Sequence, residues 1–259
     1  MILTRLKEIY AFKNLVYNLV SRDLKVKYKG SILGFFWSLL NPLVMLIVYT
    51  VAFKYIIKIR VENFPLFFLC AFLPWTFLNL SLSMSVSSIK DNANLVKKVY
   101  FPREILPLSV VLSNLVQFLL TFIILIPALL LFKIKLGFPL FFLPIIILIQ
   151  LAFILGLSYI LASLNVFFSD IRHLLEIFLQ IWFWLTPIIY PVDFVPDRFQ
   201  TLYRLNPMVL FVESYRNSLL YNAGLSGMNL ATLFCVALVF LVLGHVIFNS
   251  YNKKFAEEI

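Results

Sequence analysis

The chain alternates between long, uncharged apolar runs and short segments in which the charged residues gather. A helix that crosses the hydrocarbon core of a bilayer needs about 20 mostly apolar residues. Five runs meet this requirement: residues 31–53, 64–89, 105–132, 138–169 and 228–252. The pattern therefore predicts five transmembrane helices.

A sixth run, residues 177–192, is also uncharged but is shorter than the others and ends with the sequence TPIIYP. Proline interrupts a helix because it lacks a backbone donor and its ring clashes with the preceding turn. We interpret this run as the fifth of six spans, broken near Pro187 or Pro191. Six spans predict an all-α integral membrane protein with both termini on one side.

Composition supports this fold class. The 259 residues are 62% hydrophobic and 13% charged, whereas a soluble domain is nearer half apolar and a quarter charged. The net charge of +10 flanks the spans and forms no basic face on a soluble domain, so we expect no nucleic acid partner. Cys70 and Cys235 lie in apolar runs, which predicts no disulfide, and the charged, periodic N-terminus is unlike a signal peptide.

Orientation follows from the distribution of lysine and arginine, which concentrate on the cytoplasmic side of membrane proteins. Most of the 22 lie in the two terminal segments, in residues 90–104 and at Arg172, all of which fall on one side of a six-span chain. We therefore expect a multi-pass protein of the cytoplasmic (inner) membrane with both termini cytoplasmic.

The segment before the first span has apolar residues at helical spacing, among them Ile2, Leu6 and Ile9, with basic residues between them. This pattern is typical of an amphipathic helix in the headgroup layer. It predicts either a plain membrane anchor or a helix that also cradles a cytoplasmic partner.

Residues 90–104, KDNANLVKKVYFPRE, form the second basic segment. Asp91 or Asn92 can cap a short helix from Asn94 to Tyr100, and Pro102 would end it. Such a helix could dock in a groove of a partner, or the segment could be an ordinary basic loop.

Residues 193–227 follow the broken span and are half apolar, yet they carry Glu213 and Arg216. Apolar helices too short to span predict re-entrant helices, which are tolerated where they face protein or a water-filled cavity. Glu213 and Arg216 share one helix face, as a local ion pair or as a polar lining at a channel exit.

The sequence contains no GxxxxGK[ST], HExxH, CxxC or GxSxG motif. His173 and His245 are far apart, and the spans hold almost no carboxylates, which argues against an ion-coupled carrier. A lipid-processing glycosyltransferase would need acidic residues at the membrane surface, and the few acidic residues of this chain are scattered. We therefore expect no catalytic residue, metal site or bound cofactor in this chain.

Aromatic residues make up 17% of the chain and cluster in FFWSLL, FLCAFLPWTFLNLSLSMS and IFLQIWFWLTPIIY. Most aromatic side chains in spans face lipid or mark the interface. Aromatic faces inside a pore would instead suit a sugar chain, because pyranose rings present apolar CH faces.

Three blocks resemble the ABC-2 type permeases that export polysaccharides such as O antigen, capsule or teichoic acid. They are KYKGSILGFFWSLLNPL, NLVKKVYFPREILPLSVVLSNLVQF and the run from NVFFSDIRHLLEIF to FVESYRNSLL. The blocks follow the family order and cover essentially the whole chain. The nearest look-alike is the branch of ABC-2 exporters for drugs or lipids, which often carries a large extracytoplasmic domain.

The resemblance implies the membrane subunit of an ATP-driven exporter that moves a lipid-linked polysaccharide across the membrane. Two copies of the permease would pair with two ATP-binding cassette subunits, which would bind ATP and Mg. One domain, residues 1–259, would comprise an interface helix (1–29), spans one to five (30–192), an extracytoplasmic re-entrant gate region (193–227) and the last span with a cytoplasmic tail (228–259).

The resemblance also assigns roles to residues. The coupling helix for the ATPase subunit would be formed by Asn94, Leu95, Val96, Lys97, Lys98 and Tyr100. A pore at the dimer seam, lined by spans one, two and five, would bring Trp37, Trp75, Phe178 and Trp182 toward it. The gate region would contain Pro187, Pro191, Glu213 and Arg216, and Gly30 and Gly34 would let the elbow before the first span bend and pack closely.

Overall fold

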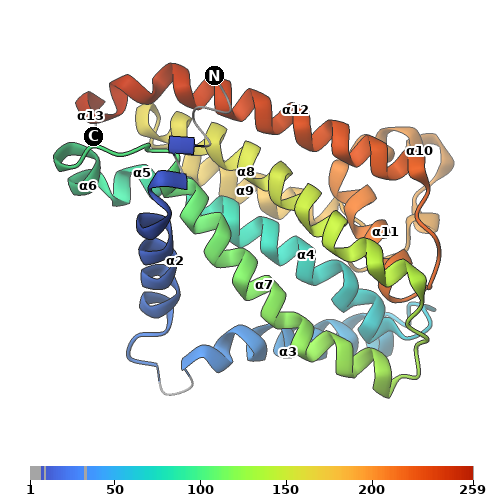
Figure 1. Ribbon diagram of the computed structural model, residues 1–259. Helices are drawn as coiled ribbons and strands as arrows, with labels where there is room; N and C mark the ends of the chain where they lie inside the picture. The colour runs from blue at the N-terminus through green and yellow to red at the C-terminus, as the bar shows by residue number, and fades with distance from the viewer. Residues whose placement is uncertain (1–6, 9, 32–33, 259) are drawn as a thin grey trace.

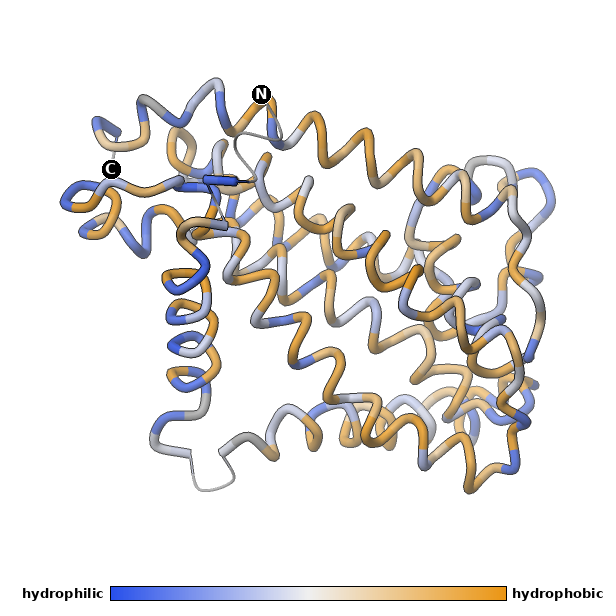
Figure 2. The backbone as a smooth tube through the Cα atoms, in the orientation of Figure 1, coloured by the Kyte–Doolittle hydropathy of each residue, from blue (hydrophilic) through white to orange (hydrophobic). Residues whose placement is uncertain are grey.

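The computed structural model describes residues 7–8, 10–31 and 34–258, and all regular secondary structure in these residues is helical. The predicted all-α fold is therefore confirmed. The predicted apolar positions Ile2, Leu6 and Ile9 lie outside the described residues. The chain forms a bundle of long helices with polar segments gathered at its two ends (Figure 2).

Among the described residues, five helical segments are long and apolar enough to cross a membrane. They correspond to the five clear runs of the sequence, and two of them begin or end with a short 3₁₀ or π segment. The segments are α3–η2 (Trp37–Tyr49 and Thr50–Ile56), α4 (Phe64–Ser85), α7 (Ile105–Leu131), η3–α8 (Phe138–Phe142 and Leu143–Phe167) and α12 (Gly227–Tyr251).

The short sixth run forms α9, Ile171–Trp184. Its 14 residues span about 21 Å at 1.5 Å per residue, which is less than the hydrocarbon thickness of about 30 Å. The helix ends three residues before Pro187, as expected for a break near that proline. The chain then continues through a buried bend that contains Ile188 and Ile189.

Helix α4 lies at the centre of the bundle. It is apolar around its whole circumference, which predicts burial on all sides. Most of its side chains are buried, among them Phe67, Phe68, Trp75 and Leu78, and they join the main hydrophobic core with residues of α7, α8 and α11 (Pro207–Leu219). Helix α4 therefore contacts α3, α7, α8, α9 and α11.

Helices α8 and α12 pack side by side along their length (Figure 1). At their contact a Cβ added to Gly244 would overlap the carbonyl oxygen of Gly156, and a Cβ at Gly156 would overlap the backbone of Phe240. Small residues allow such close approach between membrane helices, where packing rather than the hydrophobic effect holds helices together.

One end of the bundle, which we call the near end, holds α5 (Ser88–Asp91), α6 (Ala93–Lys98) and α13 (Phe255–Glu258). Leu19 of α2 (Lys13–Tyr28) packs there in one hydrophobic cluster with Val96 of α6 and Phe255 of α13. The first described helix and the last one therefore meet at the same end (Figure 1, left).

The opposite end, which we call the far end, holds α10 (Asp197–Arg204), η4 (Val192–Phe194) and the beginnings of α4, α8 and α12 (Figure 1, right). Helix α9 begins near Ser169, which accepts a hydrogen bond from Lys90 at the near end, and it ends at Trp184 on the way to the far end.

Helix α2 runs across the direction of the long helices (Figure 1). An elbow joins it to η1 (Gly34–Phe36) and α3, and Gly30 and Gly34 there have φ values of 80° and 49°. These conformations are costly for residues that carry a Cβ. A Cβ at either glycine would meet no atom of the described residues within 4 Å. The bending and close packing expected at these two glycines stay predictions.

Candidate translocation site

A cavity of about 530 Å³ lies between α3, α4 and α9. Helix α3 contributes Asn41, Met45 and Tyr49, which are four residues apart and therefore share one face. Met45 and Trp184 are exposed, so the cavity is open along one side.

The same spacing places the lining residues of the other two helices. Phe72, Trp75, Asn79 and Ser83 line the cavity from α4, and Glu176, Gln180, Phe183 and Trp184 line it from α9. Residues three and four apart lie on one helix face, so each helix presents one continuous stripe to the cavity. These stripes were present in the sequence as helical spacing, but the spacing alone did not indicate which face turned inward.

The lining changes character along the cavity. Its amide and acidic side chains at Asn41, Asn79 and Glu176 lie toward the near end of their helices, whereas Gln180 lies closer to the far-end side of α9. Its aromatic rings, among them Tyr49 and Phe72, lie toward the far end. Amides and hydroxyls bind the hydroxyl groups of a sugar, while aromatic faces cover its apolar CH groups, so this lining suits a hydrophilic chain with apolar faces.

A second cavity, of about 610 Å³, lies between α9 and α10 at the far end. Its lining is mostly aromatic and includes Phe178, Trp182, Tyr190, Phe194, Phe199 and Tyr203. The hydroxyl groups of Tyr190 and Tyr203 lie 2.8 Å apart and hydrogen-bond to each other.

Asn206 fixes the geometry between these elements. Its Oδ1 accepts hydrogen bonds from Trp182 Nε1 at 2.8 Å and from the backbone N–H of Met208 at 3.0 Å, which caps α11. Its Nδ2 donates to the Leu185 carbonyl at 3.0 Å. One side chain thus joins α9, the bend after it and the start of α11.

Helix α11 is held inside the bundle by buried polar contacts. The Tyr215 hydroxyl donates to Gln150 Oε1 at 2.8 Å, and Gln150 Nε2 donates to the carbonyl of Pro74 at 2.9 Å. These bonds link α11 through α8 to α4, and all of their partners are buried.

Arg216 is buried, and its guanidinium lies over the Phe67 ring, 3.4 Å from the centroid. It donates to the carbonyls of Phe67 at 3.3 Å and of Ile188 at 3.0 Å. Within the described part of the chain, Glu213 does not come within ion-pair distance of Arg216. The local ion pair considered from the sequence is wrong, because the arginine instead binds the backbone of α4 and of the bend after α9.

A short helix is present in the 90–104 segment as α6, but it ends at Lys98, so Tyr100, predicted as its last residue, lies beyond it. Val96 is buried in the near-end cluster, whereas Lys97, Lys98 and Tyr100 are exposed, Tyr100 to 95%. Val96 therefore attaches the helix to its own chain. Any partner would meet the lysines and the tyrosine.

The sequence profile of the ABC-2 type transporters matches residues 14–220 of this chain, from α2 to the end of α11. The chain belongs to the ABC-2 type transporter family. It is 36% identical over 260 residues to the O-antigen export system permease protein RfbA of Myxococcus xanthus, with 98% of each chain covered. It is 32% identical to an RfbA of Klebsiella pneumoniae, covering 96% of this chain and 95% of the relative.

A more distant relative is the polysialic acid transport protein KpsM of Escherichia coli, 23% identical over 239 residues, with 90% of this chain and 91% of the relative covered. The resemblance to polysaccharide-exporting ABC-2 permeases is therefore confirmed at the level of the family. The matches to the RfbA permeases extend over nearly the whole length of this ABC-2 family member.

The structure separates the four aromatic residues predicted to approach a pore. Trp75 lines the cavity between α3, α4 and α9, whereas Phe178 and Trp182 line the far-end cavity. Trp37 lies at the start of α3 and lines neither cavity. Pro187 is buried in the bend, and Pro191, Glu213 and Arg216 line a further cavity of about 300 Å³ at the far end.

Proposed function

We propose that this chain is the permease subunit of an ATP-driven exporter that moves a lipid-linked polysaccharide across the cytoplasmic membrane. The observation that carries the proposal is the open cavity between α3, α4 and α9, in a chain similar over nearly its whole length to permeases named for O-antigen export. The aromatic and amide lining suits a glycan better than a hydrocarbon ligand.

The cavity is only half of a channel. Its lining includes the exposed Met45 of α3 and Trp184 of α9, and both helices carry further exposed apolar residues, among them Val48 and Ile181. A second copy facing it across a two-fold axis would close the channel, because such an interface brings the same surface of both subunits together. We therefore propose a homodimer with the pore at its seam.

We propose that α9 is the sixth crossing. Helix α8 ends near the near end and α12 begins at the far end, so the chain must cross the bundle between them (Figure 1). Helix α9 covers most of that distance, and the bend after it completes the passage. Irregular backbone is tolerated at membrane depth when it is buried in protein, and Thr186, Ile188 and Ile189 are buried.

We propose that the near end is cytoplasmic, since it carries most of the basic residues of the chain. The ATP-binding subunit would then dock on α6 and the residues just after it, through the exposed Lys97, Lys98 and Tyr100. ATP and Mg would be bound by that partner, and its closure would move α6 and the helices attached to it.

The cavity lowers the cost of moving a polar chain through hydrocarbon. Burying an unpaired hydroxyl costs roughly 2–7 kcal/mol, so a glycan that lost its hydrogen bonds at every sugar would not cross. Amides toward the near end can replace water at entry, and aromatic rings toward the far end can slide along the CH faces of the sugars. Helices α10 and α11 would close the exit as a gate.

The proposal is tested by purifying the tagged protein from its native membranes in mild detergent and identifying co-purified proteins by mass spectrometry. A stoichiometric partner with an ATP-binding Walker A loop is expected. A deletion strain should lose surface polysaccharide and accumulate lipid-linked glycan inside the cell. A deletion that changes only drug or lipid efflux would overturn the polysaccharide substrate, and purification without an ATPase would overturn the exporter.

A further inference from the structure

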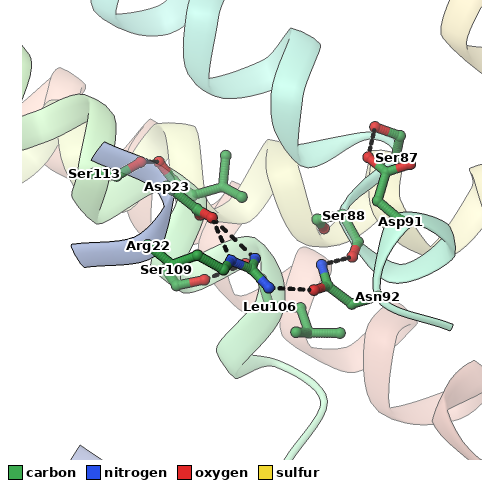
Figure 3. A network of polar contacts seen from close by, with 10 residues as sticks. Arg22, Asp23, Ser87, Ser88, Asp91, Asn92, Leu106, Ser109 and Ser113 are labelled. Carbon is green, nitrogen blue, oxygen red and sulfur yellow. Dashed lines mark hydrogen bonds and ion pairs between the residues drawn. The ribbon is translucent and has the colours of Figure 1, made fainter. Parts of the chain in front are cut away.

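Helix α2 is attached to the base of α6 by a specific side-chain contact. Arg22 Nη1 of α2 donates to Asn92 Oδ1 at 2.9 Å, across 70 residues of sequence. Figure 3 shows Arg22 between Asp23 of its own helix and Asn92, which lies beside the end of α5. The sequence pattern did not predict this contact, because Arg22 and Asn92 lie in separate basic segments.

Asn92 occupies the joint between α5 and α6. It is the residue that ends α5 and the residue that precedes the first turn of α6, with φ −110° and ψ 28°. Its Nδ2 donates to the Ser88 carbonyl at 2.8 Å, so it also holds the end of α5. A rotation of α6 relative to α5 must therefore pass through this residue.

Arg22 is held in position to reach Asn92. Its Nε and Nη2 donate to Asp23 Oδ1 at 3.1 and 2.9 Å, which leaves Nη1 free to point toward Asn92. Neighbouring residues on a helix normally point in different directions, so this pairing of adjacent side chains requires the arginine to fold back along the helix surface. A planar guanidinium with donors in a fixed fork transmits direction better than a flexible ammonium.

The same elements also share a hydrophobic cluster. Leu19 of α2 and Val96 of α6 are buried in one cluster at the near end. Apolar contacts resist separation, but they permit sliding because they have no preferred direction. The hydrogen bond from Arg22 to Asn92 is therefore the directional contact between α2 and the joint, while α2 is also held against α7 by the bond from Lys27 Nζ to Gln117 Oε1.

We propose that Arg22 and Asn92 are positioning residues that transmit movement of α6 to α2, and through the elbow to α3, which lines the cavity. This inference rests on the proposed function, since it assumes that an ATP-binding subunit moves α6. It adds that the force reaches the channel through one hydrogen bond to Asn92.

The test compares two substitutions of Asn92 in the purified complex in lipid vesicles. Asn92→Asp keeps an oxygen that accepts from Arg22 but removes the donor to Ser88, whereas Asn92→Leu removes both. The readouts are ATP hydrolysed, glycan exported and their ratio. We expect Asn92→Leu to lower glycan exported per ATP by about fivefold, the effect of losing one typical hydrogen bond, and Asn92→Asp to stay near wild type.

Two further variants serve as rescue and control. Arg22→Lys keeps a cation that can donate to Asn92 but loses the fork that Asp23 holds, so its ratio should lie between those of wild type and Asn92→Leu. Lys25→Met removes an exposed cation from the same helix and should leave the ratio unchanged. If Asn92→Asp and Asn92→Leu fell equally, the bond to Ser88 would be the important one and the proposal would be overturned.

Three other outcomes would overturn the proposal or the function on which it rests. A lower yield of Asn92→Leu complex with an unchanged ratio of glycan to ATP would show a purely structural role and would overturn the proposal. Wild-type export by all variants would overturn it as well, with the exporter itself intact. If the wild-type protein neither bound an ATPase nor moved glycan, the proposed function would fail first and this inference with it.

Discussion

Trp75 and Trp182 meet edge to face, with ring centroids 5.9 Å apart and an interplanar angle of 89°. Trp75 lines the cavity between α3, α4 and α9, and Trp182 lines the far-end cavity between α9 and α10. The pair therefore forms part of the wall between the two cavities. Its position is set by the hydrogen bond from Trp182 Nε1 to Asn206 Oδ1.

Replacing Trp182 by phenylalanine tests this wall. The substitution keeps an aromatic ring but removes the hydrogen bond to Asn206, which is expected to cost about 1 kcal/mol. We expect the midpoint of thermal unfolding in detergent to fall by roughly 2–4 °C. Trp184→Phe is the matched control, because that ring is half exposed. An equal decrease in both variants would contradict a stabilising role for the hydrogen bond between Trp182 and Asn206.

Reversing the charges of Lys97 and Lys98 tests the docking role of α6. Both lysines are exposed, so Lys97→Glu with Lys98→Glu should leave the protein folded in the membrane. An unfavourable charge at a docking surface should weaken binding of the ATPase subunit at least about tenfold, which is about 1.4 kcal/mol.

The measurements are the ATPase recovered with the permease and the glycan exported per ATP. The same reversal at Lys133 and Lys135, which are exposed at the opposite end of the third span, is the control. Normal export by the Lys97 and Lys98 variant would count against docking on α6.

Substitutions of Gly34 test the role of the elbow before the first span. Its φ of 49° should cost a residue with a Cβ roughly 1–2 kcal/mol, whatever the length of its side chain. Because no atom of the described residues lies within 4 Å of the added Cβ, Gly34→Ala and Gly34→Leu should reduce dimer assembly and export to a similar extent.

Assembly is measured by size-exclusion chromatography in detergent, with Gly224→Ala as a control at a glycine in open space. A much larger effect of leucine than of alanine would indicate close packing at the elbow in the assembled complex. Unchanged assembly and export in both variants would remove any role for Gly34.

A substitution of Tyr215 tests how α11 is attached to the bundle. Tyr215→Phe leaves the buried Gln150 Oε1 without this donor, and an unsatisfied buried acceptor costs about 1–3 kcal/mol. We expect a lower unfolding temperature and, in hydrogen exchange, faster opening of α11 than of α12. Tyr221→Phe is the control, since Tyr221 is half exposed. Equal protection of α11 in wild type and Tyr215→Phe would show that the bond to Gln150 does not hold the helix.

The sequence was sufficient to locate the long helices, because an apolar run of span length has few alternatives to a membrane helix. It also located the break near Pro187 and the short helix before Pro102, since proline restricts the backbone locally. It could not establish the path of α9 and of the bend after it, because the burial of Ile188 and Ile189 depends on packing against other helices.

For the same reason, the sequence could not predict which face of each helix is buried. Trp37 and Trp75 occur in similarly aromatic stretches, yet Trp75 is buried and Trp37 is half exposed. Glu213 and Arg216 share a helix face, but the carbonyls that bind Arg216 belong to residues 149 and 28 positions away. Contacts at such separations depend on the tertiary fold, and one sequence contains no pattern that marks them.

The most direct test of the translocation route places a photoreactive amino acid at Gln180, which lines the cavity between α3, α4 and α9. The same amino acid at Val239, an exposed position of α12, is the control. Vesicles that contain the complete complex would be supplied with lipid-linked glycan and ATP and then illuminated. We expect an ATP-dependent glycan adduct at position 180 and none at position 239. Adducts absent from position 180 during active export, or equal at both positions, would contradict a glycan path through this cavity.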